Sequence, residues 1–400
     1  MTLFVVIGIF ASLFITTWIG IQEAGYHIFR FAKNGWLSPS LFITSLIVLT
    51  SIVSLILKLK TKNSDNSVVI TMYFCAVLFL GTLFIMQSSG NWGPIVFPLE
   101  NGSQIVTFTF VIQCVTFTIG KNGVNTTYST FGRRHKLFIP HRQFDLYFEG
   151  EKTSYNADKL DSFIFMSDNH NKQSIQKFSK TNVDLILSAG DNANDGFLSN
   201  FFEFFKDYPG NKPFLTAMGN HDQRMNEDIF GFDYRNYYTK IDGVGFYFVT
   251  VQNKAMNAIV TQEGVDTSIK FIQNNFHYDD VVRILVVHAP MYPARKENGI
   301  YYIEEFEKLF DKYKFNYVLS GHTHVFTSFK RNALSLITAG SSGADSYRFK
   351  QNFFRRGMEF YVESINNTQS YVKFSRTRKR DDFHVSLYDM ETDEEIRRVK

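Results

Sequence analysis

Five short segments with metal-ligand side chains each follow an apolar run, and this pattern constrains the fold more than any other feature of the chain. The apolar runs, such as residues 163–166 and 183–187, are rich in the β-branched and aromatic residues typical of buried strands. The segments that follow are Asp168-Asn169-His170, Gly190-Asp191, Gly219-Asn220-His221-Asp222, His288 and Gly321-His322-Thr323-His324. In an open α/β sheet, the carboxyl ends of the strands form one rim beyond which ligands bind. We therefore expect the five segments to meet there, with enough oxygen and nitrogen donors for two metal ions.

The combination of the segments, and not any one of them, predicts a metal centre. A Gly-Asp pair after a strand is commonly the turn into a helix, with the carboxylate as its N-cap. Gly219-Asn220 also suits a tight turn, because both residues tolerate left-handed backbone. The most specific segment is Gly321-His322-Thr323-His324, since two histidines two positions apart on an irregular loop rarely serve packing.

With these segments in this order, residues 160–345 resemble the calcineurin-like metallophosphoesterases, and most closely their purple-acid-phosphatase-like branch. The resemblance implies an α/β sandwich of two mixed sheets flanked by helices. It implies that one metal ion is held by Asp168, His170, Asp191 and His324, and the second by the shared Asp191 with Asn220, His288 and His322. It also implies that Asn220 and His221 contact the substrate phosphate, and that His221 acts as general acid, oriented by Asp222.

Two positions depart from the purple acid phosphatases proper. These enzymes carry a tyrosine, whose tyrosinate binds ferric iron, at the position of Asn194, and they lack a histidine at the position of His170. We therefore expect the broader metallophosphoesterase site and no purple Fe(III) centre.

The donor types suit the hydrolysis of phosphate esters. A set of imidazoles, carboxylates and one amide favours Zn, Mn, Fe or Co over Ca or Mg, which prefer oxygen ligands. Two divalent cations bridged by Asp191 would clamp the phosphate and activate water. We expect attack by a metal-bound hydroxide on phosphate esters, with phosphomonoesters as the favoured substrates. Protonation of the leaving group by His221 is the kind of assistance typically worth roughly 10²- to 10⁴-fold.

Two alternative functions stay open. A phosphodiesterase acting on cyclic nucleotides or phospholipid headgroups would use the loop 290–300, where Arg295 and Lys296 could bind a second phosphate oxygen. A catalytically silent membrane receptor or adaptor could keep the same fold for binding. The complete donor set disfavours the receptor, because inactive sites usually lose a ligand.

The first ninety residues predict a membrane anchor. Residues 2–21, 41–57 and 68–87 are apolar and uncharged, and each is close to the roughly 20 residues that span a bilayer. The first stretch could instead be a signal peptide, but it lacks a basic start and a convincing cleavage site. We expect an integral membrane protein with three transmembrane helices.

The distribution of basic residues predicts the orientation of this anchor. Lys58, Lys60 and Lys62 occupy the second loop, whereas no basic residue occurs between residues 88 and 120. Because cytoplasmic loops are enriched in Lys and Arg, the catalytic domain is expected to be extracytoplasmic. Arg30 and Lys33 in the first loop oppose this assignment. The two cysteines form no pattern that indicates a compartment.

The remaining chain divides at about residue 158. Strand-like runs at residues 105–119, 136–139 and 144–148 predict a small β-rich domain over 91–158, followed by the catalytic domain over 159–400. Residues 359–400 also alternate like strands and are expected to complete one sheet of the sandwich. The net charge of +4 comes with no long basic stripe, so we expect no nucleic-acid partner and see no sign of an obligate protein partner. The expected partners are a phosphate-ester substrate and the lipid bilayer.

Overall fold

The computed structural model describes residues 91–399, apart from 171–172, 195–199, 202–203, 205–207, 209, 223–228, 253–258, 292–302, 346–358 and 363–368. The three predicted membrane spans lie outside the described residues, so the anchor stays a prediction. Within the part of the chain that is described, no helix is long and apolar enough to cross a membrane.

A five-stranded sheet precedes the sandwich. Its strands are β1 (Asn91–Leu99), β2 (Gly102–Lys121), β3 (Val124–Ile139), β4 (Gln143–Phe148) and β5 (Glu151–Asn156), in the order β1-β2-β4-β5 with β3 paired to β2. The β2–β3 hairpin turns at Asn122 and Gly123, which both have positive φ, as a two-residue hairpin turn of the favoured twist requires. Alternate residues of β2, such as Phe117 and Ile119, pack with Phe144 and Leu146 of β4 in one apolar core.

The first sheet of the sandwich has six strands. They are β6 (Ser162–Met166), β7 (Leu185–Ser188), β8 (Phe214–Thr216), β16 (Ser370–Arg376), β17 (Phe383–Asp389) and β18 (Glu395–Arg398), in the order β18-β17-β16-β6-β7-β8. Strands β6, β7 and β8 run parallel, and their nearly continuous apolar sequences fit strands covered on both faces. The short 3₁₀ helix η1 (Gln173–Ser179) lies between β6 and β7 in the chain.

The second sheet has seven strands. They are β9 (Tyr237–Ile241), β10 (Val244–Val249), β11 (Val282–Val287), β12 (Tyr317–Ser320), β13 (Thr327–Arg331), β14 (Leu334–Thr338) and β15 (Glu359–Val362), in the order β15-β13-β14-β12-β11-β10-β9. Strands β10, β11, β12 and β14 are parallel neighbours. Their shared direction brings the loops after β11 and β12 to the same edge.

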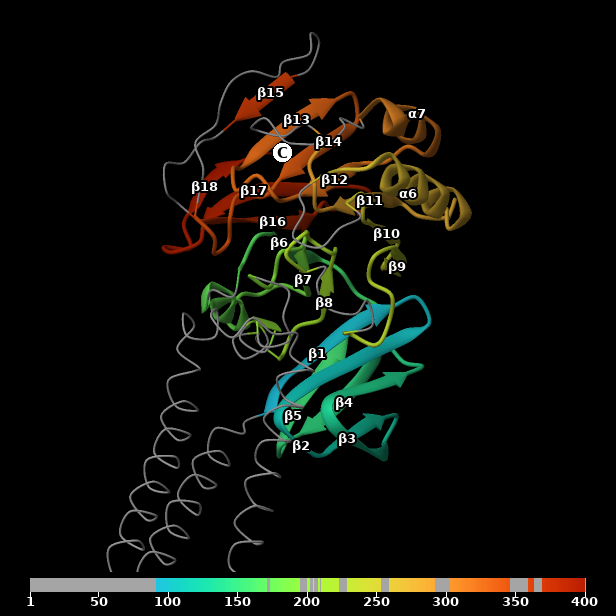
Figure 1. Cartoon of the computed structure of the whole chain (residues 1–400), viewed down its shortest axis with the longest axis vertical. Coiled ribbons are helices and arrows are strands. Elements are labelled where there is room, and N and C mark those ends of the chain that lie inside the picture. The colour runs from blue at the N-terminus through green and yellow to red at the C-terminus, as the bar shows by residue number, and fades with distance from the viewer. Residues whose placement is uncertain are drawn as a thin grey trace, which may run out of the picture. The chain divides into compact units, whose positions relative to one another are not determined.

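Helices cover one face of the seven-stranded sheet, and the six-stranded sheet packs on the other. Helices α6 (Gln262–Asn274) and α7 (Ile303–Tyr313) lie beside β10 to β14 (Figure 1) and share one apolar cluster with them. Between the sheets, the ring of Phe163 on β6 lies 5.9 Å from that of Phe246 on β10. Tyr317 on β12 meets Phe374 on β16 at 5.5 Å. The apolar contacts thus hold the two sheets face to face.

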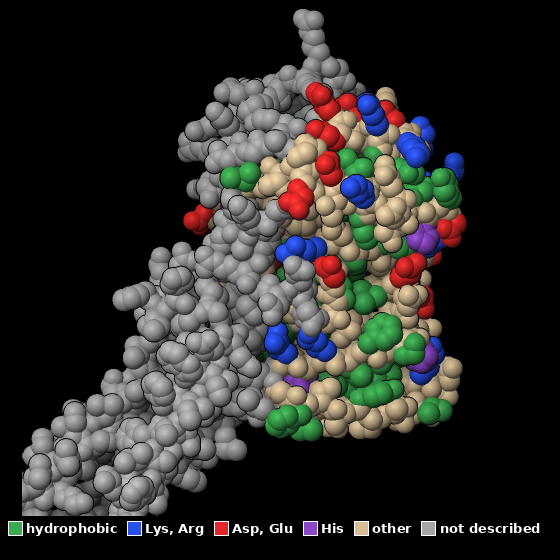
Figure 2. Space-filling model, turned by 45° about the vertical axis from the view of Figure 1, so that its right-hand side comes forward, with side chains coloured by type: hydrophobic (Ala, Val, Ile, Leu, Met, Phe, Trp, Pro, Cys, Tyr) green, Lys and Arg blue, Asp and Glu red, His purple; other side chains and the backbone are tan. Residues whose placement is uncertain are grey.

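The five-stranded sheet contacts the edge strands of both larger sheets. Val96 of β1 forms a parallel bridge with Pro213, directly before edge strand β8. The hydroxyl of Thr239 on edge strand β9 donates to the carbonyl of Pro98 at 3.0 Å. These contacts cover strand edges that would otherwise expose unpaired backbone groups. On the face shown in Figure 2, Lys and Arg side chains are interspersed with Asp and Glu.

The predicted mixed α/β sandwich with a β-rich region before it is confirmed, with two differences of detail. The segment at 359–399 contributes to both sheets and not to one, because β15 pairs with β13 while β16 pairs with β6. Strands β1 and β5 and the first half of β3 were not expected. Pro94 inside β1 and the Thr- and Ser-rich run of β3 resemble loop sequence, and pairing with β2 overrides that local preference.

Candidate metal centre

Each of the five segments predicted from the sequence directly follows a parallel strand. They follow β6, β7, β8, β11 and β12, and they supply Asp168, Asp191, Asn220, His288 and the pair His322 and His324. Because three of these strands belong to one sheet and two to the other, the site lies where the carboxyl ends of both sheets meet. The structure brings together all seven residues that were predicted to bind metal.

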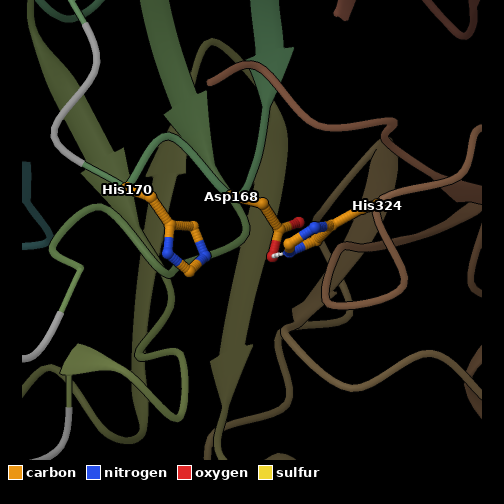
Figure 3. A group of neighbouring side chains, drawn as sticks. All are labelled: Asp168, His170 and His324. Carbon is orange, nitrogen blue, oxygen red and sulfur yellow. Dashed lines mark ion pairs between the residues drawn. The ribbon is translucent and has the colours of Figure 1, made fainter. Parts of the chain in front are cut away.

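The first donor group consists of Asp168, His170 and His324, whose ligand atoms lie within 4.8 Å of one another. The Nε2 atom of His324 faces Asp168 Oδ1 at 3.3 Å, and the ring of His170 points toward the same carboxylate from the other side (Figure 3). The second oxygen of Asp168 accepts the backbone N–H of His322 at 2.9 Å. Asp168 therefore links the first and last segments.

The second donor group consists of Asp191, His288 and His322. His288 Nε2 lies 3.2 Å from Asp191 Oδ2 and 3.1 Å from Asn220 Oδ1. Asp191 Oδ2 is also 3.6 Å from His170 Nε2, and Asp191 forms a third group with His170 and His221. Asp191 thus stands between the donors assigned to the two ions.

Backbone conformation places these side chains. Positive φ angles occur at Asp168 (55°), His170 (50°), Asp191 (53°), His322 (71°) and His324 (53°). Such angles are costly for residues other than glycine and persist where the surrounding structure enforces them, often at functional sites. Gly219 permits the close approach of Asp191, because a Cβ there would lie 2.1 Å from Asp191 Oδ1.

The electrostatics tie the histidines to the two buried carboxylates. Burial disfavours protonation of His288, but Asp191 and Asp168 outweigh it and raise the pKa of His288 to about 9. The pKa of His170 is raised to about 9 in the same way, against its burial and mainly by Asp191. Burial would raise the pKa of Asp168, yet His324 and His288 lower it to about 2. Both aspartates are therefore anionic at neutral pH and attract cations.

The residues fit divalent metal ions. Asp168 and Asp191 are almost fully buried, and burying two carboxylates so close together is costly unless cations compensate them. Asp168 Oδ1 and His170 Nε2 are buried and, among the described residues, accept or donate no hydrogen bond. Four imidazoles, two carboxylates and an amide oxygen form the mixed donor set that transition metals prefer.

The predicted role of Asp222 as the residue that orients His221 is wrong. Asp222 is fully buried, and its carboxylate accepts the backbone N–H groups of Asp191 at 2.8 Å, Gly219 at 3.0 Å and Ala193 at 3.1 Å. Burial and the charge of Asp191 raise the pKa of Asp222 to about 7. The carboxylate thus stabilises the turn around Asp191, and the hydrogen bonds of its two oxygens go to backbone amides and not to the ring of His221.

His221 takes its orientation from two other groups. Its Nδ1 hydrogen-bonds the backbone carbonyl of Asn194, and its own N–H donates to Asp191 Oδ1 at 2.8 Å. The ring packs edge to face on His170, with 4.6 Å between the ring centroids. The predicted substrate contacts Arg295 and Lys296 lie outside the described residues.

Three residues of the site make contacts that were not predicted from the sequence. The hydroxyl of Ser341 donates to the carbonyl of Asp168 at 3.2 Å, and that of Ser342 donates to the carbonyl of Ser167 at 2.7 Å. These bonds hold the turn at Asp168 from a loop more than 170 positions away in the chain. The side chain of Asn194 contacts His170 Nδ1 at 3.2 Å. A Gly-Ser-Ser-Gly run directly after an apolar strand was the available signal for the serines.

Comparison with known proteins agrees with this geometry. Residues 161–326 match the sequence model of the calcineurin-like phosphoesterase family. No curated protein matches the chain. Purple acid phosphatase PPD1 from yellow lupin (Lupinus luteus) seeds is similar in structure over 77% of this chain and 73% of its own, with a TM-score of 0.56 and 11% sequence identity, which shows a shared fold. GAP50, described as the anchor in the inner membrane complex of Plasmodium, is similar over 60% of this chain and 87% of its own, with a TM-score of 0.44 and 16% sequence identity.

Proposed function

We propose, from the premise that the chain carries a calcineurin-like metallophosphoesterase domain of the purple-acid-phosphatase-like kind, that the protein is a dinuclear-metal phosphoesterase with phosphomonoesters as its favoured substrates. The observation that carries the proposal is the position of Asp191. Its carboxylate belongs to one donor group with His170 and to another with His288 and His322. A carboxylate in that position can bridge two cations, as in two-metal hydrolases.

The donors divide between two ions around this bridge. One ion would be held by Asp168, His170, Asp191 and His324, and the other by Asp191, Asn220, His288 and His322. When bound, two such ions lower the pKa of water and neutralise the charge of a phosphate ester. Asn220 contributes an oxygen without a negative charge, which keeps the centre attractive to an anion.

His221 is the proposed general acid. Because its Nδ1 is engaged by the Asn194 carbonyl, Nε2 is the nitrogen left to donate a proton to the leaving oxygen. The bond from its N–H to Asp191 fixes the acid relative to the proposed bridge at 2.8 Å. Proton donation and metal binding therefore share one rigid turn.

The test of the dinuclear site is Asp191→Asn in the full-length protein. The amide keeps the shape of the carboxylate but removes the bridging charge, so we expect a lower content of both metals and a loss of turnover by orders of magnitude. Metal analysis and phosphatase assays on the same sample measure the two effects. Asp279→Asn is the matched control, since the side chain of Asp279 is 76% exposed and lies outside the site. Full metal content and full activity in Asp191→Asn would contradict the proposed two-metal site.

The preference for monoesters has a separate test. The purified protein, loaded with one metal at a time, is assayed on a phosphomonoester, a phosphodiester and a phospholipid headgroup ester. We expect the monoester to be turned over fastest. Faster hydrolysis of the diester or lipid would favour the phosphodiesterase alternative, and no hydrolysis by the metal-loaded protein would favour a binding role for the fold.

The proposed location is the extracytoplasmic face of a membrane, on an anchor within residues 1–90. The support is the run of Lys58, Lys60 and Lys62 in the second predicted loop. Protease added to intact cells or spheroplasts should then digest the catalytic domain. Digestion only after lysis would reverse the proposed orientation.

A further inference from the structure

We propose that Asn194 is a positioning residue whose side chain presents Nε2 of His170 to a metal ion, an inference that rests on the proposed dinuclear function. Asn194 lies at the end of the Gly190-Asp191 turn, on the exposed side of the site. Its side-chain oxygen Oδ1 is 3.2 Å from His170 Nδ1. Nothing in the chemistry of hydrolysis itself requires this contact.

Four histidines of the site have Nδ1 partners among the described residues, and these histidines are held in two different ways. Backbone carbonyls hold three of them, through Ala189 for His288 at 2.8 Å, Asp345 for His324 at 2.8 Å, and Asn194 for His221. His170 is the fourth, and its Nδ1 partner is the side chain of Asn194. The orientation of His170 therefore depends on the identity of a side chain and can be changed by substitution.

The contact determines which ring nitrogen of His170 is available. Metal binding requires the neutral imidazole, and an amide oxygen only accepts hydrogen bonds, so in the metal-binding form of His170 Nδ1 carries the proton and Nε2 keeps its lone pair. Nε2 is buried, points toward Asp191 Oδ2 at 3.6 Å, and makes no hydrogen bond within the described part of the chain. Partners of this kind behind a metal-binding histidine commonly change metal affinity about 10- to 100-fold when removed.

The same residue also holds His221, but through its backbone. Because the carbonyl of Asn194 remains after any substitution, losing the side chain should loosen His170 while leaving the Nδ1 bond of His221 in place. The two functions of Asn194 are therefore separable by experiment. If Asn194 only stabilised the local fold, its substitution would displace the rings of His170 and His221 together.

The experiment compares Asn194→Leu, which has a similar size and no acceptor, with Asn194→Asp, which keeps an acceptor and adds charge. Stepwise metal binding to the full-length protein is measured by competition with a chromophoric chelator, using Mn or Zn alone. In Asn194→Leu we expect one of the two binding steps to weaken about 10- to 100-fold and the other to stay at the parent value. Asn194→Asp should restore or exceed the parent affinity, since a carboxylate makes the imidazole a stronger donor.

A second readout separates His170 from His221. In metal-saturated Asn194→Leu, the dependence of rate on the leaving group should match that of the parent, because the acid keeps its backbone partner. Asn156→Leu is the control, because Asn156 is exposed and its side-chain oxygen accepts the N–H of Asp158, outside the site. Both metal-binding steps of this variant should match those of the parent protein.

Three results would overturn the inference: unchanged affinity in Asn194→Leu, equal weakening of both steps, or failure of Asn194→Asp to restore the lost step. Failure of the proposed function looks different, because the parent protein itself would then bind fewer than two metal ions.

Discussion

His221 illustrates how one turn can serve two tasks at the residue scale. Its backbone N–H contacts the proposed bridging carboxylate, and its ring is turned by the carbonyl of Asn194. We predict that the His221→Ala protein still binds both metal ions. Its turnover rate should fall by roughly 10²- to 10⁴-fold for substrates with poor leaving groups. A good leaving group needs little proton donation, so nitrophenyl phosphate should be affected least. Rates over a series of aryl and alkyl phosphates, with metal analysis of the same preparation, measure this.

The control for this prediction is His384→Ala, since His384 is exposed on β17 and outside the site. An equal loss for nitrophenyl and alkyl esters would exclude the acid role. Loss of a metal ion would instead make His221 a ligand, an outcome allowed by its position within 4.8 Å of the donor atoms of His170 and Asp191.

Asp222 shows where residue-level prediction fails. Its place beside His221 in the sequence suggests a pair of interacting side chains, but its oxygens accept three amides from two different loops. That arrangement depends on the left-handed turn at Asp191. No local pattern in the sequence encodes a contact of this kind, whereas the donor residues themselves were visible because each follows its own strand.

At the scale of elements, a buried carboxylate fastens β9 and β10 to the loop before β11. Asp280 accepts the hydroxyl of Tyr238 on β9 at 2.8 Å and that of Tyr247 on β10 at 2.7 Å. Lys240 lies 3.5 Å away, and the side chain of Asp280 is fully buried. Burial and Asp280 together hold the pKa of both tyrosines far above the ordinary value, so both stay protonated donors.

We predict that Asp280→Ala lowers the urea unfolding midpoint by an amount corresponding to about 2–4 kcal/mol, because two buried hydroxyls lose their acceptor. Metal content and turnover of the folded fraction should be unchanged, since Asp280 precedes the amino end of β11 and His288 follows its carboxyl end. Asp279→Ala is the matched control: it also pairs with Lys240, at 2.6 Å, but is exposed, and such surface pairs contribute about 0–1 kcal/mol. Equal shifts of the unfolding midpoint in the two variants would contradict the larger contribution predicted for the buried Asp280.

The strands show which parts of the elements a sequence can reveal. Runs such as β11 and β12 are mainly apolar and end directly before a segment that carries a proposed ligand, so both their type and their ends could be predicted. The exposed half of β3 and the proline-containing β1 have no such pattern and become strands only by pairing with β2. The sheet to which each of the last strands belongs is set by a partner strand that is distant in the sequence. The local sequence pattern therefore did not reveal that β15 joins one sheet and β16 the other.

At the scale of the whole molecule, metal binding competes with protons. In the metal-free protein the pKa of His170 and that of His288 are both about 9, above the ordinary 6.5. Both rings are therefore protonated at neutral pH and must release protons when a metal binds. We predict that the apparent Mn affinity rises as pH increases from 6.5 to 9, with proton release over that range.

Titration calorimetry in buffers of different ionisation enthalpy measures this release. The same shifts give the metal-free protein a stabilising contribution that is full below pH 6.5 and lost as pH rises through about 9. Chelator-treated protein should therefore melt at a lower temperature at pH 9 than at pH 6.5, and a metal affinity independent of pH would contradict the assignment of these imidazoles as ligands.

The meeting of both sheets at the site has a consequence for the folding of the chain. Asp168 and Asp191 come from one sheet, His288 and His322 from the other, and the chain between the first and last ligand includes both. A partly synthesised chain that ends before β12 lacks His322 and His324, one proposed ligand of each ion. Parallel pairing between distant strands is also among the slower steps of folding. Under the proposed ligand assignment, complete coordination of both ions therefore requires that the two sheets have docked.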